Sequence, residues 1–525
     1  MNPAHAKSQS LYATMSTATR YGFVGRSQTG RLTARFLLGL SLGAALLFGS
    51  LVNAESWRAL AALKELTLDH GRDNTTEFSW LDIKPSRKLQ WHTCYDGAYE
   101  CARLDVPLDW QDPTDDERVI LAISKLKATT TDPADYKGAV FFNPGGPGGS
   151  GVWALQDRGA KLQTITGRNH DVISWDPRGI GASVPRVECW GGDAVSRRLW
   201  GIQDPGVIDA HPGVLNDAFA RATAFSQMCE ERVTRETPGL LEHVGTASHA
   251  RDLLEIMEQM GLEKLRYWGF SYGTVLGGVF ASMYPDKVER LVSDGNVDYR
   301  EWHLGTHINF LRDTDTVMKA FYEYCHSAGP ETCAFYAETP EAIRQRHAAL
   351  LEDIRKHPII IPSGESGPDM PQLVTWSDVK RMTSSTLYQP IYMFKNFANI
   401  LQALEARDGA PYYDAVRAGA APTCEAGTTP PDVPTLAEGT DDAFPAIMCA
   451  DRGVSAGEET VEEFEEYTNQ LMDISTAVGD VLALFRLACI GRTVKPKWKY
   501  DGMLTSLLDF VTTSMQCQIK LCSLS

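Results

Sequence analysis

Residues 265–283 read LRYWGFSYGTVLGGVFASM, and this stretch decides the fold. At its centre, residues 269–273 form a G-x-S-x-G pattern between an apolar run typical of a buried strand and a small-residue run typical of a helix packed on a sheet. A strand that turns sharply into a helix exposes the intervening serine hydroxyl above the sheet, and the helix N-terminus favours negative charge beside it. The pattern predicts that Ser271 is a nucleophile. The alternative is a glycine-rich packing turn whose serine has no chemical role.

Composition sets the class of protein. The chain has 525 residues, 43% hydrophobic and 22% charged, which is ordinary for a globular protein and long enough for an α/β hydrolase with an inserted lid. The formal net charge of −17 argues against a nucleic-acid partner and fits an acidic enzyme. The strand, elbow and helix at 265–283 predict an α/β class, an α/β-hydrolase fold with a mostly parallel sheet and an inserted helical cap, and this length and composition are compatible with it.

A glycine-rich loop is the second informative motif. The apolar strand 139–142 runs directly into NPGGPGGSG at 143–151. In this fold the loop after the third strand supplies one backbone donor of an oxyanion hole, and the residue after the nucleophile supplies the other. The amides of Gly146 and Tyr272 are the two candidates. A phosphate-binding loop is the main rival, but the Lys-Ser/Thr pair of a P-loop is missing; a flexible linker is the other alternative.

Other local patterns give the rest of the predicted core. Strand-like runs alternate with turn signals, and an amphipathic helix over 248–260 leads into the nucleophile strand. Asp176 and Arg178 follow a buried strand at the sheet edge where α/β proteins bind ligands, so Asp176 is a candidate substrate-binding residue. Bracing of the turn is the favoured interpretation for this pair. The expected strands are 102–108, 119–126, 139–142, 172–175, 265–268 and 287–293.

From about Tyr299 to Gly479 the pattern becomes helical, and no strand is expected there. An inserted helical cap over the active-site edge fits best, with a separate helical domain as the alternative. Within it, the apolar run 447–450 ends in Asp451. A carboxylate in the cap is suited to hold a free α-amine, so Asp451 is a second candidate substrate-binding residue. The sequence shows no cluster of metal ligands, and we expect neither a metal nor an organic cofactor.

The chain contains eleven cysteines, and two close pairs stand out: Cys94 with Cys101, and Cys325 with Cys333. Neither pair has the C-x-x-C spacing of a zinc or thioredoxin-like site. Local disulfides formed in an oxidising compartment are the favoured interpretation, and reduced buried thiols are the alternative.

The N-terminal region predicts secretion. Arg31 and Arg35 precede the apolar run 36–52, which ends in a plausible small-residue cleavage site at 52–54. A cleaved signal peptide is favoured over a single-pass membrane anchor at about 36–52, and either would place the catalytic part outside the cytosol. Asn74-Thr75-Thr76 is a possible glycosylation acceptor.

A serine nucleophile needs a histidine base oriented by an acid, and in this fold the chain order is Ser, then Asp or Glu, then His. The last histidine in the chain is His357, inside the predicted cap. His243 and His249 precede the serine and belong to the helix that feeds its strand. We expect none of the cap histidines to act as the base; these are His303, His307, His326, His347 and His357.

The glycine loop and the elbow also carry a resemblance. Together with WDPRGIG (175–181), SDGNVD (293–298) and the cap run 447–451, they resemble the secreted tripeptidyl aminopeptidase-like branch of the α/β-hydrolases, of fungal type and related to prolyl aminopeptidases. The resemblance covers about residues 91–500. It implies Ser271 as the nucleophile, with Gly146 and Tyr272 as oxyanion donors.

Members of that family continue into an N-x-x-D-P-x-T-P motif with the catalytic acid and a G-H-C motif with the base. Residues 501–525 match neither motif. We expect a truncated or mis-spliced C-terminus, an incomplete end of the core and an open sheet edge with an exposed apolar face. A catalytically dead member is the alternative.

The functional prediction is a serine exopeptidase that cleaves peptides near their free N-termini. A non-catalytic secreted binding protein and an esterase are the alternatives, because this fold hosts many chemistries. The predicted partners are peptide substrates with a free N-terminus, with no nucleic acid and with membrane only if the leader is retained. The expected organisation is a signal segment (1–54), a polar segment (55–90), a hydrolase core (91–298), a helical cap (299–479), a return to the core (480–500) and an aberrant tail (501–525).

Overall fold

The structure is a computed structural model that describes residues 78–130, 132–363, 368, 370–417, 436–452 and 458–500. The predicted leader 1–54, the glycosylation acceptor at Asn74 and the tail 501–525 lie outside the described residues.

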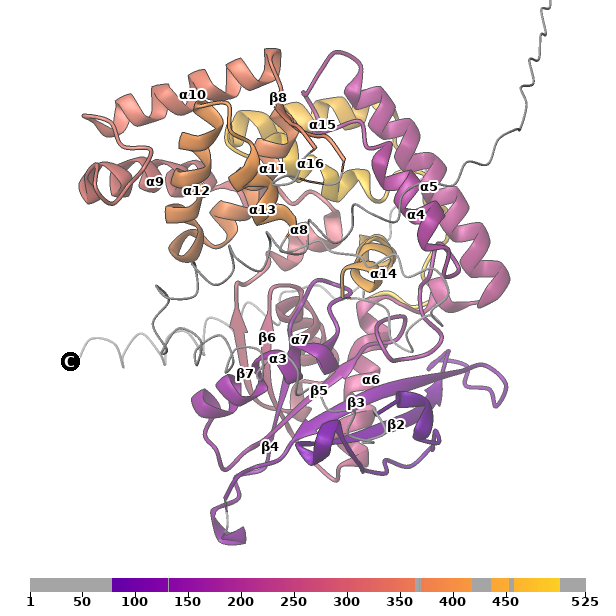
Figure 1. Ribbon diagram of the computed structural model, residues 1–525. Helices are drawn as coiled ribbons and strands as arrows, with labels where there is room; N and C mark the ends of the chain where they lie inside the picture. Colours follow the sequence, from indigo (N-terminus) through magenta and orange to yellow (C-terminus); the bar gives the residue numbers. More distant parts are fainter. Residues whose placement is uncertain are drawn as a thin grey trace, which may run out of the picture. The chain divides into compact units, whose positions relative to one another are not determined.

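The main sheet of the described chain is mixed and has seven strands, in the order β1-β2-β3-β5-β4-β6-β7 (Figure 1). The first three strands in sequence pair antiparallel, and β5, β4, β6 and β7 run parallel to one another. This arrangement confirms the predicted α/β fold class with a mostly parallel sheet. The strands are β1 (His92–Cys94), β2 (Tyr99–Pro107), β3 (Arg118–Leu126), β4 (Ala139–Asn143), β5 (Asp171–Asp176), β6 (Leu265–Phe270) and β7 (Val288–Asp294).

Helices cover both faces of the sheet because successive side chains of a strand point to opposite sides. Phe142 packs with Leu155 and Leu162 of α3 (Gly151–Thr166) on one face. Its neighbour Phe141 belongs to the larger core on the other face. That core includes buried residues of α6 (Thr246–Gln259) and α7 (Tyr272–Met283), which pack against each other.

The sheet face that carries α3 is open beside β7. Val292 of β7 is 49% exposed and Ile165 of α3 is 71% exposed. A groove of about 580 Å³ lies between them, lined also by Trp268 and Val140. Within the described residues, β7 pairs only with β6.

The chain after β7 is mainly helical, but the expectation that it contains no strand is wrong. Three β-branched residues, Ile359–Ile361 (β8), pair antiparallel with Gln372–Val374 (β9). Strands of three residues are too short to produce a recognisable alternating pattern. The hairpin contributes Ile359, Ile361 and Val374 to a hydrophobic core that is separate from the core of the main sheet.

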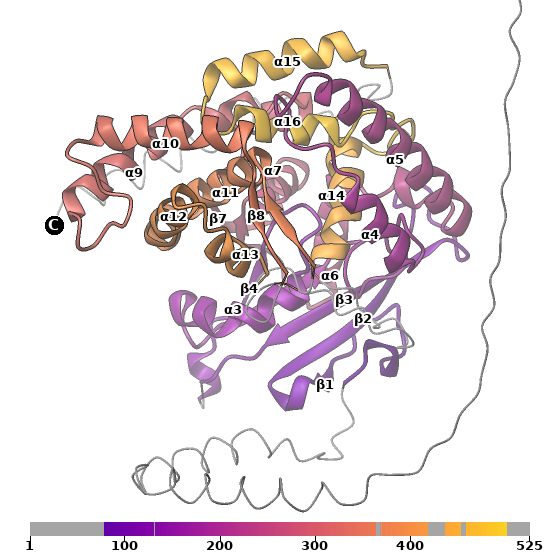
Figure 2. The same ribbon diagram turned by 45° about the horizontal axis from the view of Figure 1, so that its top comes forward.

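Two more helical groups lie around this region. α15 and α16 pack against each other and against α5 (Figure 2), and α14 contacts α8. The helices not yet given are α4 (Ala194–Ile202), α5 (Val214–Glu236), α8 (Tyr299–Leu304), α9 (Thr314–Ala328), α10 (Pro340–Lys356), α11 (Trp376–Tyr388), α12 (Pro390–Glu405), α13 (Ala410–Arg417), α14 (Leu436–Arg452), α15 (Val461–Ile474) and α16 (Gly479–Leu487). The short 3₁₀ helices are η1 (Trp80–Asp82), η2 (Tyr95–Gly97), η3 (Pro133–Asp135), η4 (Leu240–Glu242), η5 (Pro285–Lys287) and η6 (Ile308–Leu311).

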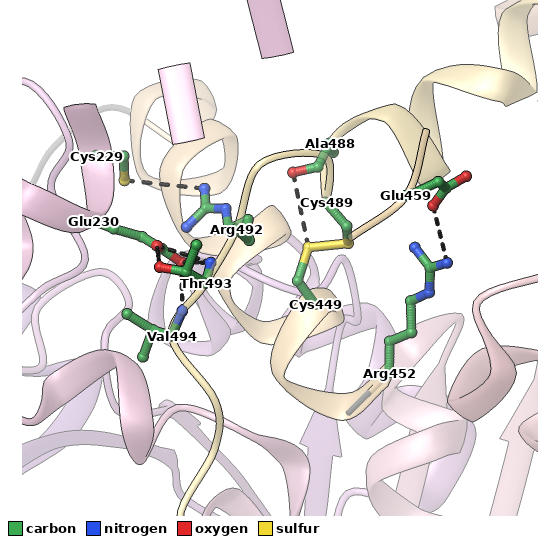
Figure 3. The surroundings of a disulfide bond; sticks show 10 residues. All are labelled: Cys229, Glu230, Cys449, Arg452, Glu459, Ala488, Cys489, Arg492, Thr493 and Val494. Carbon is green, nitrogen blue, oxygen red and sulfur yellow. Dashed lines mark hydrogen bonds and ion pairs between the residues drawn. A yellow bond between two sulfur atoms is a disulfide. The ribbon is translucent and has the colours of Figure 1, made fainter. Parts of the chain in front are cut away.

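Four disulfides cross-link the described chain. Cys94–Cys101 and Cys325–Cys333 confirm the two local pairs expected from sequence spacing. Cys189–Cys229 and Cys449–Cys489 each join residues 40 positions apart. The last of these ties the end of α14 to the segment after α16 (Figure 3). None of the helices in the part of the chain described here is both long and apolar enough to span a membrane.

Candidate active site

Ser271 lies in the sharp turn between β6 and α7. Its backbone has φ 53° and ψ −123°, a conformation that a residue with a side chain adopts only when its surroundings impose it. Its amide donates to the Asp294 carbonyl at 3.0 Å, which ties the turn to the end of β7. A Cβ on Gly269 would lie 2.3 Å from the Gly273 carbonyl oxygen, and one on Gly273 would lie 2.7 Å from the Asn143 carbonyl oxygen. Both glycines of the G-x-S-x-G pattern are therefore required by close packing.

The glycine loop after β4 touches this turn. Gly145 has φ +89°, and a Cβ there would lie 3.0 Å from both the Ser271 Cβ and the Tyr272 amide nitrogen. The Gly145 amide donates to Asn143 Oδ1 at 2.9 Å, which leaves the next amide, that of Gly146, as the candidate donor. The Tyr272 amide belongs to the first turn of α7, where amides have no acceptor within the helix. The loop and the elbow predicted from sequence are thus brought together.

Asp176 is fully buried at the end of β5. Its Oδ1 accepts from the Ser150 hydroxyl at 2.7 Å and the Val152 amide at 3.0 Å, and its Oδ2 accepts from the Ala182 amide at 2.7 Å. Burial raises the pKa of this carboxyl. Because its oxygens are occupied and none of its surface is exposed, the structure places Asp176 where it braces the glycine loop and out of reach of a substrate.

Arg178 fixes the turn after β5 through buried contacts with α6 and with the backbone after β2. It is fully buried, and its guanidinium donates to both oxygens of Asp252 on α6, at 2.7 and 2.6 Å. It also donates to the Leu108 carbonyl at 2.5 Å, and Trp110 Nε1 donates to Asp252 at 2.8 Å. The bracing interpretation of the Asp-x-Arg turn therefore agrees with the contacts of both residues.

Asp451 lies at the end of α14 and is 4% exposed. Its Oδ1 accepts from the Thr246 amide at 2.7 Å, and its Oδ2 accepts from the Thr246 hydroxyl at 2.5 Å and Trp302 Nε1 at 2.9 Å. The Thr246 hydroxyl lies 2.6 Å from the hydroxyl of Tyr272. Three donors therefore contact this carboxylate within the described chain, and none of these contacts involves Ser271.

The comparisons with known proteins bear on the fold and on the class of protein. A family model described as "alpha/beta hydrolase fold" matches residues 138–376, which include the glycine loop, β5, the elbow and β7. The chain has the α/β-hydrolase fold. The matched range also reaches α8–α10 and the β8–β9 hairpin, up to the first residue of α11.

Several curated relatives are similar to this chain. "Serine protease Hip1" of Mycobacterium tuberculosis (strain ATCC 25618 / H37Rv) is 29% identical over 348 residues, 64% of this chain and 63% of that protein. "Tripeptidyl aminopeptidase" of Streptomyces lividans is 32% identical over 243 residues, 44% and 43% of the two chains. "Carboxylesterase B" of M. tuberculosis (strain CDC 1551 / Oshkosh) is 26% identical over 294 residues, 55% and 52%. This chain thus spans less than two thirds of the length of each.

No hydrogen bond joins the Ser271 hydroxyl to a histidine or a carboxylate among the residues that the structure describes. His249 contacts the elbow, but its Nδ1 lies 3.1 Å from the Tyr272 hydroxyl and makes no hydrogen bond to Ser271. Burial, together with the Arg178 guanidinium, lowers the pKa of His249 to about 3, so it is neutral at physiological pH. Over the same described ranges, no group of three or more His, Cys, Asp or Glu side chains could hold a metal ion.

Sequence reasoning missed the side chains that hold the elbow in place: Thr246, Trp302, His249 and the hydroxyl of Tyr272. Thr246 and His249 sit in an amphipathic helix whose pattern explains them as ordinary core residues, and Trp302 lies in a helical segment without any motif. Thr246 and Trp302 contact Asp451, which lies 205 and 149 residues further along the chain, and no local signal links positions so far apart.

Buried His307 makes the stability of the protein depend on pH in a predictable way. It is 1% exposed, and both ring nitrogens lack a hydrogen-bond partner among the described residues. Burial, with the Arg452 and Arg486 guanidinium groups nearby, lowers the pKa of His307 to about 4, whereas the unfolded chain has a value of about 6.5. The unfolded state therefore binds the proton first, and stability is lost as the pH falls from about 6.5 to about 4.

Replacing His307 by phenylalanine removes this titration within a pocket that already contains the rings of Trp302, Phe310 and Phe485. The free energy of unfolding of the wild type should fall between pH 8 and pH 5. In H307F we expect this fall to be smaller by about 2 kcal/mol. Urea titrations at the two pH values measure it. His307→Gln, which also does not titrate, should show the same flattening; an unchanged pH dependence in both variants would contradict the assignment.

Proposed function

We propose that the protein is a serine hydrolase whose nucleophile is Ser271 and that its reaction is exopeptidase cleavage near a free N-terminus. The observation that carries the proposal is the strained Ser271 conformation, φ 53°, at the end of β6, with the Gly145–Gly146 loop packed against it. A residue other than glycine keeps such a conformation only where the surrounding structure enforces it, and these positions cluster at active sites. Two relatives named as a serine protease and a tripeptidyl aminopeptidase support the peptidase class.

In the proposed reaction, the Ser271 oxygen attacks the scissile carbonyl carbon and forms a tetrahedral intermediate. The Gly146 and Tyr272 amides donate to the oxygen that becomes negative, and the N-terminus of α7 stabilises the same charge. Collapse of the intermediate expels the amine and leaves an acyl-enzyme, which water hydrolyses. A base must take the serine proton and give it to the leaving amine, and a carboxylic acid side chain must orient that base; the described residues do not assign either role.

Two other functions use the same residues. An esterase is favoured by the relative named "Carboxylesterase B", and its chemistry needs the same nucleophile and oxyanion donors. A non-catalytic binding protein is favoured by the Ser271 hydroxyl, which has no histidine partner within the described chain. Aminoacyl-amide and aminoacyl-ester substrates separate the first two possibilities, and the absence of any turnover separates the third.

The test is covalent labelling with a fluorophosphonate probe, followed by turnover assays on tripeptidyl amides and the matching esters. We expect the wild-type chain to be labelled on Ser271 and S271A to lose both the label and any turnover. Ser282→Ala on the same helix is the matched control, since Ser282 Oγ is buried without a hydrogen-bond partner. It should label at the wild-type rate. A well-folded wild-type chain that neither labels nor turns over would refute the hydrolase proposal and favour the binding protein.

A further inference from the structure

A chain of buried hydrogen bonds joins α14 to the residue after the nucleophile. Thr246, the first residue of α6, is fully buried between Asp451 of α14 and Tyr272 of α7. Its hydroxyl lies 2.5 Å from Asp451 Oδ2 and 2.6 Å from the Tyr272 hydroxyl, which in turn lies 3.1 Å from His249 Nδ1. Tyr272 thus has two roles: its amide is the proposed oxyanion donor, and its hydroxyl lies within a chain that runs from His249 to Asp451.

The positions of the hydrogens in this chain follow from the count of donors. Asp451 is a carboxylate that already accepts from two N–H groups, so the Thr246 hydroxyl must donate to it. Having used its one hydrogen, Thr246 can only accept from the Tyr272 hydroxyl. The Tyr272 oxygen then accepts from His249, which requires the hydrogen of the neutral imidazole to lie on Nδ1. The order is His249 Nδ1–H to Tyr272 to Thr246 to Asp451.

The carboxylate that ends the chain is fixed in space by covalent and ionic bonds. Two residues earlier in α14, Cys449 is joined to Cys489 by a disulfide, and Arg452, the next residue, pairs with Glu459 at 3.1 Å (Figure 3). The segment after Cys489 is held in turn by Glu230 of α5, which accepts from the Thr493 amide and hydroxyl (Figure 3). The end of α14 is therefore anchored from both sides.

Aromatic packing adds a second link between the same elements. The Tyr272 ring packs on Trp302 at a centroid distance of 5.4 Å, and Trp302 Nε1 donates to Asp451 Oδ2. Both rings are 2% exposed. The carboxylate thus holds Tyr272 through its hydroxyl and through the ring beside it, so a shift of Asp451 is transmitted to the first turn of α7.

We propose that Asp451, acting through Thr246, is a positioning residue that sets the Tyr272 amide in the oxyanion hole. The inference rests on the proposed function of Ser271 and Tyr272. It gives α14 a part in catalysis without contact with the substrate. Removal of the link lets the first turn of α7 relax, which weakens a hydrogen bond made to the transition state and leaves ground-state binding almost unchanged.

The test compares Thr246→Val, which keeps the shape and the backbone bond to Asp451, with Thr246→Ser, which restores the hydroxyl. We expect T246V to lower kcat about tenfold with KM within about twofold of the wild type, and T246S to recover most of the loss. Thr383→Val is the matched control, because Thr383 is also buried in a helix, α11, and donates its hydroxyl to the Val379 carbonyl at 2.8 Å. A loss of kcat in T383V as large as in T246V would refute the positioning role.

A second readout does not depend on turnover. Selective ¹⁵N labelling of histidine reports which ring nitrogen carries the hydrogen. We expect His249 to carry it on Nδ1 in the wild type and in T246S. In T246V the Tyr272 hydroxyl loses its acceptor and turns to His249 Nδ1, so the hydrogen should move to Nε2. Hydrogen on Nε2 in the wild type would overturn the chain. If the wild type is neither labelled nor active, both the proposed function and the positioning role are refuted. If the wild type is labelled and T246V has the same kcat as the wild type, only the positioning role is refuted.

Discussion

Replacing Asp252 by alanine is expected to lower the free energy of unfolding by about 3–5 kcal/mol, because it leaves a buried guanidinium without its counter-charge. Arg178 and Asp252 are both 0% exposed and joined by two hydrogen bonds, so water cannot take the place of the lost carboxylate without opening the core. The indole N–H of Trp110 loses its acceptor in the same variant. Urea unfolding followed by tryptophan fluorescence measures the change.

Two controls separate this ion pair from a general effect of charge removal. Glu341→Ala breaks an exposed pair with Arg344 on the surface of α10, where we expect a change of less than about 1 kcal/mol. The double variant Arg178→Met/Asp252→Leu replaces both charges by apolar side chains of similar size and should recover much of the stability. A D252A variant as stable as E341A would show that the pair contributes little.

The sequence was sufficient for features that depend on near neighbours in the chain. The strands over 102–108, 119–126, 139–142, 172–175, 265–268 and 287–293 were expected and occur with shifts of a few residues. The G-x-S-x-G pattern predicted the turn at Ser271 because two glycines, each required by backbone packing, lie within two residues of it. The disulfides Cys94–Cys101 and Cys325–Cys333 could be predicted for the same reason, since each closes a loop of fewer than ten residues.

Features that join distant segments could not be predicted. Asp451 was assigned to a substrate amine because a lone carboxylate in a helical segment shows no partner in the sequence, whereas the fold places it against Thr246 and Trp302. The disulfide Cys449–Cys489 and the hydrogen bond between Ser150 and Asp176 also join residues that are far apart in the sequence. The β8–β9 hairpin was missed for a different reason, since three-residue strands leave no periodic signal.

The bond between Ser150 and Asp176 connects the fold to the proposed chemistry. Ser150 caps α3 by accepting from the Trp153 amide and donates its own hydrogen to Asp176, while the glycine loop 145–149 lies immediately before it. The loop is thus fixed at one end by Asn143, through the Gly145 amide, and at the other by Asp176, through Ser150 and Val152. A loop rich in glycine has many accessible conformations, so these two anchors, together with the bond from the Gly149 amide to the Gly145 carbonyl at 3.2 Å, restrict where the Gly146 amide points.

Replacing Asp176 by alanine is therefore expected to reduce turnover at least a hundredfold, about the effect of losing one oxyanion donor, and to destabilise the protein by about 3 kcal/mol through three buried donors left without an acceptor. Steady-state kinetics and urea unfolding measure the two effects. Asp171→Ala is the matched control: Asp171 begins the same strand and accepts from the Ala128 amide and the Tyr136 hydroxyl, but at the opposite end from Ser271. D171A should lose stability while keeping its turnover. Equal turnover losses in D171A and D176A would mean that Asp176 supports only the fold, and that the glycine loop does not depend on it for the oxyanion hole.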